Sequence, residues 1–189
     1  MVERIVQTVY FDIPGDVNTE RTLEIAESRA KELGIRTMVV ATTEGDTGAK
    51  AAQRFKGLET IAVTHATGFR DLNIQRLTPE NRAAIEKNGG KILTCIHAFA
   101  GINRAIRNKM ETYQVDEIIA FAFRTFGQGI KVCVEIAVMA ADAGLLKVGD
   151  PCIVIAGTGK GADTAVVLTP VNAQHFFDIR IHEILCKPY

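Results

Sequence analysis

Hydrophobic and polar positions change their period along the chain, from helical spacing to strand-length runs and back. A stripe at helical spacing begins after Asn18 and ends before Gly34, residues typical of the two ends of a helix. Shorter helical patterns begin near Asp46 and at Thr78, where Pro79 occupies the first helical position. Apolar runs of strand length, typical of strands buried on both faces, occur at 37–41, 60–64, 91–95 and 152–156. This alternation predicts an α/β fold with a mostly parallel sheet.

The carboxy-terminal half contains two longer helical patterns, separated at residues 126–129. The second, 130–143, is apolar on nearly every side, which predicts either burial on two sides within the chain or a contact between subunits. On this ground we expect a homo-oligomer that shares residues 132–141. A strand is predicted at 165–168, and the alternation of Ile179 and Ile181 with polar residues predicts an edge strand. We expect a single domain over residues 1–189, with three layers, helices on both faces of the sheet and an antiparallel edge strand.

Composition and charge restrict the classes of partner. Of the 189 residues, 47% are hydrophobic and 23% are charged, as in a globular domain. Lys and Arg together number 22, as do Asp and Glu, so the zero net charge argues against a nucleic-acid partner. The amino terminus has no secretory apolar segment and charges interrupt the longest apolar stretches, so we expect no membrane partner. Four cysteines without zinc-ribbon or thioredoxin spacing favour reduced thiols and a cytoplasmic location.

The loop at 42–48 follows the first buried run and precedes a helix. A helix amino terminus offers unpaired N–H groups and a partial positive charge, so a phosphate fits such a loop without a lysine. The hydroxyl and glycine residues that would contact it are Thr43, Gly45, Thr47 and Gly48. The carboxylates of Glu44 and Asp46 oppose this interpretation, unless they turn outward or bind ligand hydroxyls. An ordinary strand-to-helix turn is the alternative.

A second loop, 157–164, is rich in glycine and follows the last central run. Its spacing imitates a dinucleotide-binding fingerprint, but no full helix and strand unit follows it. We expect a flap that closes over a ligand, and a flexible hairpin turn is the alternative. The residues concerned are Gly157, Thr158, Gly159, Lys160, Gly161, Ala162, Asp163 and Thr164.

Two histidines, His65 and His97, lie at or near the ends of predicted parallel strands, which places both at the ligand edge of an open sheet. They are the candidates for catalysis. Gly68 and Phe69 lie close to His65, where the glycine permits an unusual backbone and the phenylalanine offers a ring. No third metal ligand accompanies the histidines, so we expect no metal. The loop that His65 opens, 65–77, is longer than a passive connection needs.

The segment 124–129 interrupts an apolar helical pattern with two glycines, which are unfavourable inside a helix. Phe126, Gly127 and Gly129 could let the backbone approach a flat ligand, and a plain helix–helix corner explains them equally well. Glu135, within the apolar helix, is either buried beside Arg124 or part of an exposed stripe.

The chain resembles the carboxy-terminal α/β domain of pyruvate kinase. The resemblance rests on the strand and phosphate loop at 39–47, on the Gly-Asp-x-x-Ile-Val-x-x-Gly pattern at 149–157, and on the glycine loop behind it. The whole chain is more similar to a family of small archaeal and bacterial proteins with this fold and no assigned function, through the stretches 64–70, 126–129, 140–144 and 157–164. Members of that family are thought to bind flavin mononucleotide (FMN).

The resemblance implies a phosphorylated small-molecule ligand, FMN in the first place, with unknown chemistry. The phosphate is expected on the loop at 42–48, the ring among His65, Phe69, His97 and the Gly127 region, and the flap at 157–164 above it. Pyruvate kinase activity is expected to be absent, because the catalytic barrel of that enzyme is missing. One alternative is a free-standing regulatory module that senses a sugar phosphate without catalysis, and another is an assembly protein.

Overall fold

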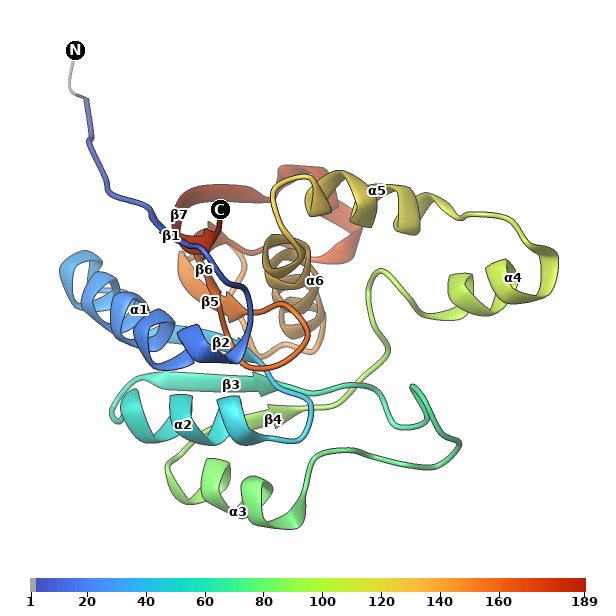
Figure 1. Cartoon of the computed structure of the whole chain (residues 1–189), viewed down its shortest axis with the longest axis horizontal. Helices are drawn as coiled ribbons and strands as arrows, with labels where there is room; N and C mark the ends of the chain where they lie inside the picture. The colour runs from blue at the N-terminus through green and yellow to red at the C-terminus, as the bar shows by residue number, and fades with distance from the viewer. Residues whose placement is uncertain (1–2) are drawn as a thin grey trace.

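A computed structural model describes residues 3–189 as a seven-stranded sheet between two layers of helices (Figure 1). The strand order is β1-β7-β6-β5-β2-β3-β4, and β6 runs antiparallel to both of its neighbours, whereas every other pairing is parallel. The strands are β1 (Val9–Phe11), β2 (Thr37–Ala41), β3 (Glu59–Val63), β4 (Lys91–Leu93), β5 (Cys152–Ala156), β6 (Thr164–Thr169) and β7 (Arg180–Pro188). The expected mostly parallel α/β sheet is confirmed.

The α-helices are α1 (Thr19–Leu33), α2 (Asp46–Arg54), α3 (Pro79–Lys87), α4 (Ile102–Met110), α5 (Val115–Arg124) and α6 (Gln128–Asp142), with 3-10 turns η1 (Asp16–Asn18) and η2 (Ala173–Asp178). Helices α1, α2 and α3 cover one face of the sheet, and α6 covers the other, with α5 outside it (Figure 1). Along β2, Met38 and Val40 pack in the core with α1, while Val39 packs with α6. Because both faces are covered, the central strands are continuously apolar.

One predicted element differs from the structure. The first helical pattern of the carboxy-terminal half contains two helices, α4 and α5, because the chain leaves α4 at Glu111 with a positive φ of 53°. The strand around Ile179 and Ile181 is antiparallel to β6 at the edge of the sheet, as expected. The short parallel β1 extends this edge, and it pairs only with residues 186–188 at the far end of β7.

Helix α6 is enclosed within the chain. From Gly129 to Ala141 every residue of α6 except Val132 is buried, between the sheet on one side and α5 and η2 on the other. Burial on two sides, the first of the two expectations, explains its sequence. The segment 132–141 therefore offers no surface to another subunit, and a homo-oligomer, which stays a prediction, needs a different interface.

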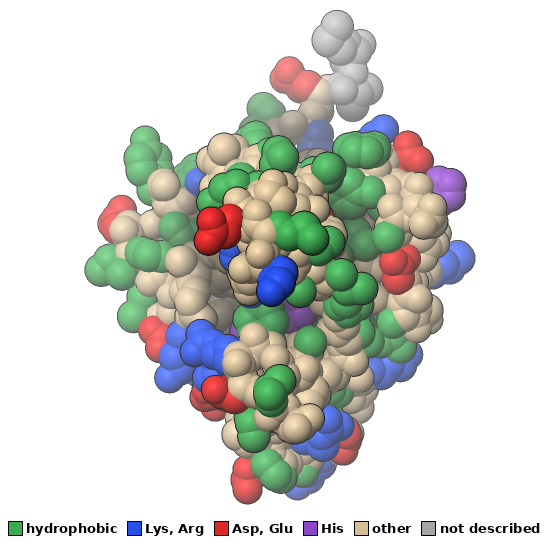
Figure 2. Space-filling model, turned by 90° about the vertical axis from the view of Figure 1, so that its right-hand side faces the viewer, with side chains coloured by type: hydrophobic (Ala, Val, Ile, Leu, Met, Phe, Trp, Pro, Cys, Tyr) green, Lys and Arg blue, Asp and Glu red, His purple; other side chains and the backbone are tan. Residues whose placement is uncertain are grey.

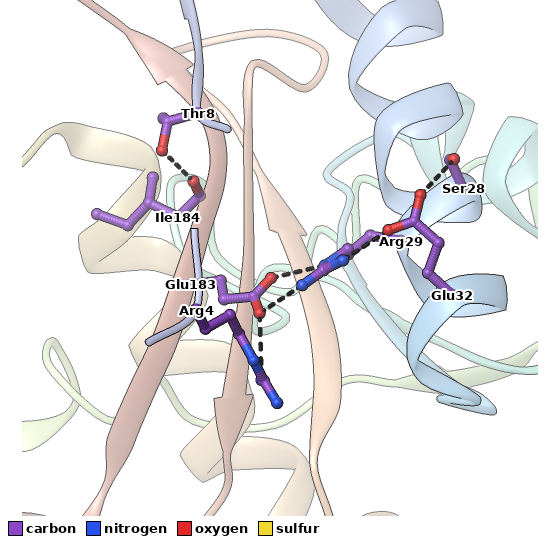
Figure 3. Close-up of polar contacts among 7 residues, drawn as sticks. All are labelled: Arg4, Thr8, Ser28, Arg29, Glu32, Glu183 and Ile184. Carbon is purple, nitrogen blue, oxygen red and sulfur yellow. Dashed lines mark hydrogen bonds and ion pairs between the residues drawn. The ribbon is translucent and has the colours of Figure 1, made fainter. Parts of the chain in front are cut away.

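The amino-terminal segment is held against β7 and α1 by a charged contact (Figure 3). The Arg29 guanidinium donates two hydrogen bonds of 2.7 Å to the Glu183 carboxylate, and Arg4 lies 3.8 Å from it. The Thr8 hydroxyl donates to the Ile184 carbonyl at 2.8 Å. The hydrogen bonds from Arg29 hold the pKa of Glu183 below its usual value. This contact joins α1 to the edge of the sheet.

Three of the four cysteines, Cys133, Cys152 and Cys186, are buried, and Cys95 is partly buried. All four are free thiols, as the sequence predicts. Burial raises the pKa of each, to about 12 at Cys152 and about 11 at Cys186. Across residues 3–189, none of the helices combines the length and the apolar character needed to span a bilayer.

The core between α1 and the sheet gives a test of the fold. Phe55 is only 1% exposed, whereas Phe177 is 82% exposed. We expect Phe55→Ala to lower the free energy of unfolding by about 3–5 kcal/mol, because it removes buried area and leaves a cavity. The matched Phe177→Ala should change it by less than about 0.5 kcal/mol. Urea unfolding followed by circular dichroism measures both, and equal losses in the two variants would contradict the assigned core.

Candidate functional site

A polar cavity of ≈ 640 Å³ lies at the carboxyl ends of β2, β3 and β5. The carboxyl edge of a parallel sheet is where open α/β folds bind ligands. Its walls come from the loop after β2, the start of α1, the start of α6 and the loop between β5 and β6. The lining residues are Asp16, Thr19, Ala41, Thr42, Thr43, Glu44, Asp46, Thr47, Lys50, His65, Arg70, Arg76, Gln128, Val132, Gly157, Gly159, Lys160 and Gly161.

Three helix amino termini converge on this cavity: those of α1, α2 and α6. None of the three N-cap residues caps its helix with a side-chain hydrogen bond. Such ends present unpaired N–H groups and a partial positive charge, so together they favour an anion.

Charged side chains strengthen this preference. Lys50, Arg70, Arg76 and Lys160 line the cavity, against three carboxylates, those of Asp16, Glu44 and Asp46. Glu44 is held by an ion pair with Arg76, and Lys50 pairs with Glu20 at 2.8 Å. Among the described residues, Arg70 and Lys160 make no ion pair. The side chains of Arg70 and Lys160 are therefore available to bind an anion in this cavity.

Within the loop at 42–48, the structure separates lining residues from packing residues. Thr43, Glu44 and Thr47 line the cavity, while Gly45 and Gly48 do not. Gly45 has a φ of 109°, and a Cβ there would lie 2.3 Å from the Asn81 Cβ. A Cβ on Gly48 would lie 3.0 Å from the Ile85 side chain. These glycines therefore bring α2 close to α3 and the sheet. The spacing of the glycines in the sequence does not distinguish this packing role from close contact with a phosphate.

The loop at 157–164 forms a fixed wall. Gly157, Gly159, Lys160 and Gly161 line the cavity. The three residues behind them, Ala162, Asp163 and Thr164, are buried and anchor the loop.

The anchoring contacts of this loop reach α1. One oxygen of the fully buried Asp163 accepts hydrogen bonds from the Gly15 N–H at 2.8 Å and the Thr158 N–H at 3.0 Å. The Ala162 N–H donates to the Thr19 hydroxyl at 3.0 Å. These contacts do not favour a flap that opens and closes, because opening would leave the Asp163 carboxylate without its hydrogen-bond donors.

A second recess of ≈ 250 Å³ shares part of its wall with the first cavity, namely Ala41, Thr42, Thr43, His65, Gln128 and Val132. Beyond this wall it is lined by three cations, Arg104, Arg124 and Lys131, and by one carboxylate, Glu135. Its remaining lining includes the rings of Phe69 and His97 and the apolar side chains of Ile136 and Met139. The two cavities thus join a polar chamber to an aromatic one.

The aromatic wall is a compact cluster. The ring centroids of His65 and His97 are 5.3 Å apart, and Phe69 lies 4.6 Å from each, stacked on His97 at 17°. The Arg104 guanidinium lies 5.0 Å from the Phe69 ring centroid. The predicted proximity of the two histidines and Phe69 is therefore present in the structure. Gly68 shapes the turn, with a φ of 80°, and lies outside both linings.

Both histidines are poor bases in this environment. Burial, with His97 and then Arg76 and Arg70 nearby, lowers the pKa of His65 to about 4. Burial also lowers the pKa of His97. His97 Nε2 accepts a hydrogen bond of 3.2 Å from the Ala66 N–H, so in the neutral ring the proton is on Nδ1. Neutral imidazoles at pH 7 can accept a proton from a ligand but do not add positive charge.

The helix α6 contributes a buried ion pair. Glu135 is 3% exposed, so it is not part of an exposed stripe, and its partner is Lys131, one turn earlier, rather than Arg124. The Phe99 N–H donates to the other Glu135 oxygen at 3.1 Å. Burial lowers the pKa of Lys131, although Glu135 opposes this shift. Arg124 instead donates to the Gln128 side chain at 2.8 Å.

The break before α6 serves packing and places one lining residue. Phe126 is exposed, and Phe126, Gly127 and Gly129 lie outside both linings. A Cβ on Gly129 would lie 2.0 Å from the Thr164 hydroxyl oxygen, so this glycine lets α6 approach β6. Gln128, between the two glycines, lines both cavities.

Sequence reasoning identified Lys160 among the cations of the polar cavity, but not Lys50, Arg70 or Arg76. Arg70 and Arg76 belong to the long loop at 65–77, whose length was the available signal. Lys131 and Glu135 stand four residues apart in an apolar helix, a spacing that pairs charges on one face. Asp16 and Thr19 gave no signal, because only the docking of α1 brings them to the cavity. Among residues 3–189, no cluster of three or more His, Cys, Asp or Glu side chains is arranged for a metal.

The sheet order and the cavity at its carboxyl edge define a three-layer α/β domain with a polar site between its loops. The chain belongs to the family described as pyruvate kinase, alpha/beta domain, which matches residues 20–168. It is also similar to the crystal structure of a pyruvate kinase from Cryptosporidium parvum, with 15% identity and a TM-score of 0.41. That similarity covers 84% of this chain and 23% of the enzyme, so the chain spans less than a quarter of the enzyme's length.

The low pKa of His65 predicts a pH dependence. Its folded-state pKa of about 4 lies below its ordinary value of 6.5, so the unfolded chain binds a proton more readily. Stability should therefore fall as the pH drops from about 6.5 to about 4, and His97 adds a loss of the same sign. We expect His65→Gln to reduce this slope and the exposed His175→Gln to leave it unchanged. Urea midpoints at several pH values measure both slopes, and identical slopes in all three proteins would refute the environment assigned to His65.

Asp163 allows a graded test of the fixed wall. Asp163→Ala should lower the free energy of unfolding by about 2–4 kcal/mol, because it leaves buried N–H groups without an acceptor. Asp163→Asn should cost less, since an amide oxygen can still accept from both. The exposed Asp12→Ala serves as control and should change stability by less than about 0.5 kcal/mol. If Asp163→Ala unfolds at the same denaturant concentration as the control, the loop is not anchored in this way.

Proposed function

We propose that this protein binds a phosphorylated small molecule, FMN in the first place, with its phosphate in the polar cavity and its ring in the aromatic recess. The observation that carries the proposal is the union of the two chambers through one wall, which contains Thr43, His65 and Gln128. A ligand with an anionic end and a flat end matches this arrangement. The volume of the polar cavity, ≈ 640 Å³, is within the range of ligand pockets, roughly 300–1,000 Å³, and the adjoining recess adds ≈ 250 Å³.

The polar chamber supports the phosphate end. Unpaired N–H groups of three helices and the free cations Arg70 and Lys160 are the partners that an anion needs. Thr43 and Thr47 add hydroxyl groups from the loop after β2. The phosphate contacts would come from five separate segments of the chain, so binding would depend on the assembled fold.

The aromatic recess supports the ring. Phe69 and His97 provide flat surfaces, and two buried nitrogens beside them, His65 Nδ1 and Arg104 Nε, have no hydrogen-bond partner among the described residues. Buried polar atoms are normally paired, so these two fit a ligand that carries hydrogen-bonding groups at its ring edge. Arg104, Arg124 and Lys131 would surround that edge with positive charge.

FMN, when bound, supplies hydride and electron transfer. The chain itself would bind the phosphate, orient the ring between Phe69 and the wall of α6, and limit the access of water. His65 and His97 remain the candidates for a catalytic role. His65 would be the group able to accept a proton, because its Nδ1 has no partner among the described residues, whereas His97 Nε2 already accepts from the Ala66 N–H.

The test compares FMN with riboflavin, which lacks the phosphate, by calorimetry and by flavin fluorescence. We expect FMN to bind at least roughly a hundredfold more tightly, because two charge-assisted hydrogen bonds at about 1.5–3 kcal/mol each would be lost. Thr43→Asp should abolish FMN binding by placing a carboxylate in the shared wall. Val148→Asp adds the same charge in the turn between α6 and β5, outside both linings, and should bind FMN as the unchanged protein does.

Equal binding of FMN and riboflavin would contradict the phosphate chamber. Binding of a sugar phosphate without any flavin would replace the proposal by that of a regulatory module. Binding of no phosphorylated ligand would overturn both.

A further inference from the structure

The segment that contains α4 and α5 exposes an unusual amount of apolar surface. We call residues 102–124 the α4–α5 arm. Helix α4 buries no residue at all and stands apart from the body of the molecule (Figure 1). Helix α5 buries only Glu117 and Ala120. A helix that is apolar around most of its circumference is normally covered on both sides, and in the single chain the outer side of α5 is not.

Six large apolar side chains of the arm are exposed, and we call them together the arm face. Its members are Ile102, Met110, Tyr113, Val115, Ile118 and Phe121, with exposures between 50% and 73%. Val115, Ile118 and Phe121 recur at three-residue spacing along α5, and Tyr113 meets Phe121 edge-on with 5.9 Å between the ring centroids. Figure 2 looks at the side from which the arm projects, where hydrophobic side chains surround the protruding segment.

The area of this surface matches what an interface needs. At roughly 100 Å² apiece, the six side chains present roughly 600 Å² of apolar surface. Monomeric proteins rarely expose a contiguous apolar patch larger than a few hundred Å². A standard interface buries about 800 Å² on each partner, so the arm face would form its apolar centre and the polar residues around it the rim.

The charges on the arm favour a second copy of the same chain. A two-fold interface must be complementary to itself, because each patch meets its own image. Lys109 and Glu111 stand at the tip with opposite charges, both exposed and both without an ion pair among the described residues. A two-fold axis that passes close to the tip would bring Lys109 of one copy towards Glu111 of the other. The zero net charge of the chain adds no repulsion between copies.

We infer that two copies of this chain associate through their arm faces about a two-fold axis. The interface covers the outer side of α5 and gives α4 the packing partner that the single chain does not provide. The interface also fixes the position of α4, and with it Arg104, whose guanidinium lies 5.0 Å from the Phe69 ring centroid in the aromatic recess. This inference does not depend on the proposed ligand.

Light scattering after gel filtration tests the interface. The unchanged protein should have twice the mass of one chain. Ile118→Glu, at a side chain 59% exposed, should weaken association by at least about tenfold, because a carboxylate cannot be buried there without a partner. The control is Val148→Glu, at a side chain 44% exposed outside the arm, which should remain a dimer.

Circular dichroism confirms that each variant is folded. Met110→Lys on α4 is a second disrupting variant, since α4 contains no buried residue and the change leaves the core intact. A mass of one chain for the unchanged protein at tens of micromolar overturns the inference. So does a dimer that persists in both Ile118→Glu and Met110→Lys, because the contact would then lie elsewhere.

Discussion

The buried carboxylate of Asp163 connects the three parts of the molecule that have to meet for a site to exist. It accepts hydrogen bonds from the Gly15 N–H before α1 and from the Thr158 N–H in the loop after β5, and its second oxygen accepts from the Thr164 hydroxyl at the start of β6. A charged group without solvent is tolerated only when donors surround it. Asp163 thereby fixes the segment before α1 against the loop after β5, and with it one wall of the cavity.

Close approach of backbone segments is the second constraint. Gly129 lets the start of α6 touch Thr164, and Gly161 lets the loop after β5 touch Asp16, where a Cβ would lie 2.4 Å from the Asp16 Cα. Both contacts draw helix amino termini towards the same place. The convergence of α1, α2 and α6 is thus a consequence of packing, and the positive potential that they create follows from it.

The aromatic recess depends on the long connections that interrupt the regular alternation of strand and helix. Residues 65–77 contribute His65 and Phe69 to the recess, and the segment after β4 contributes His97 and Arg104. Burial of these groups makes both imidazoles weak bases, while the ion pair of Lys131 with Glu135 crosses the floor of the recess. The same segment continues into the arm, so the surface through which we infer association is continuous with a wall of the site.

The sequence by itself determined the class of fold and most of its elements. Strands β2 and β5 have the predicted limits, and α1 and α3 end where their glycine and cap residues predicted, because period and capping are local properties. It also indicated both glycine loops and the pair of histidines, since these follow strands. Only the tertiary structure decided which glycines approach neighbouring segments, that α6 is enclosed, that Glu135 pairs with Lys131, and that Arg70, Lys160, Asp16 and Thr19 share one cavity. The physical reason is that each of these contacts joins residues distant in sequence or depends on which side of an element faces its neighbour. The hydrophobic period indicates only that one side of a helix or strand is covered, and it does not indicate which segment covers it.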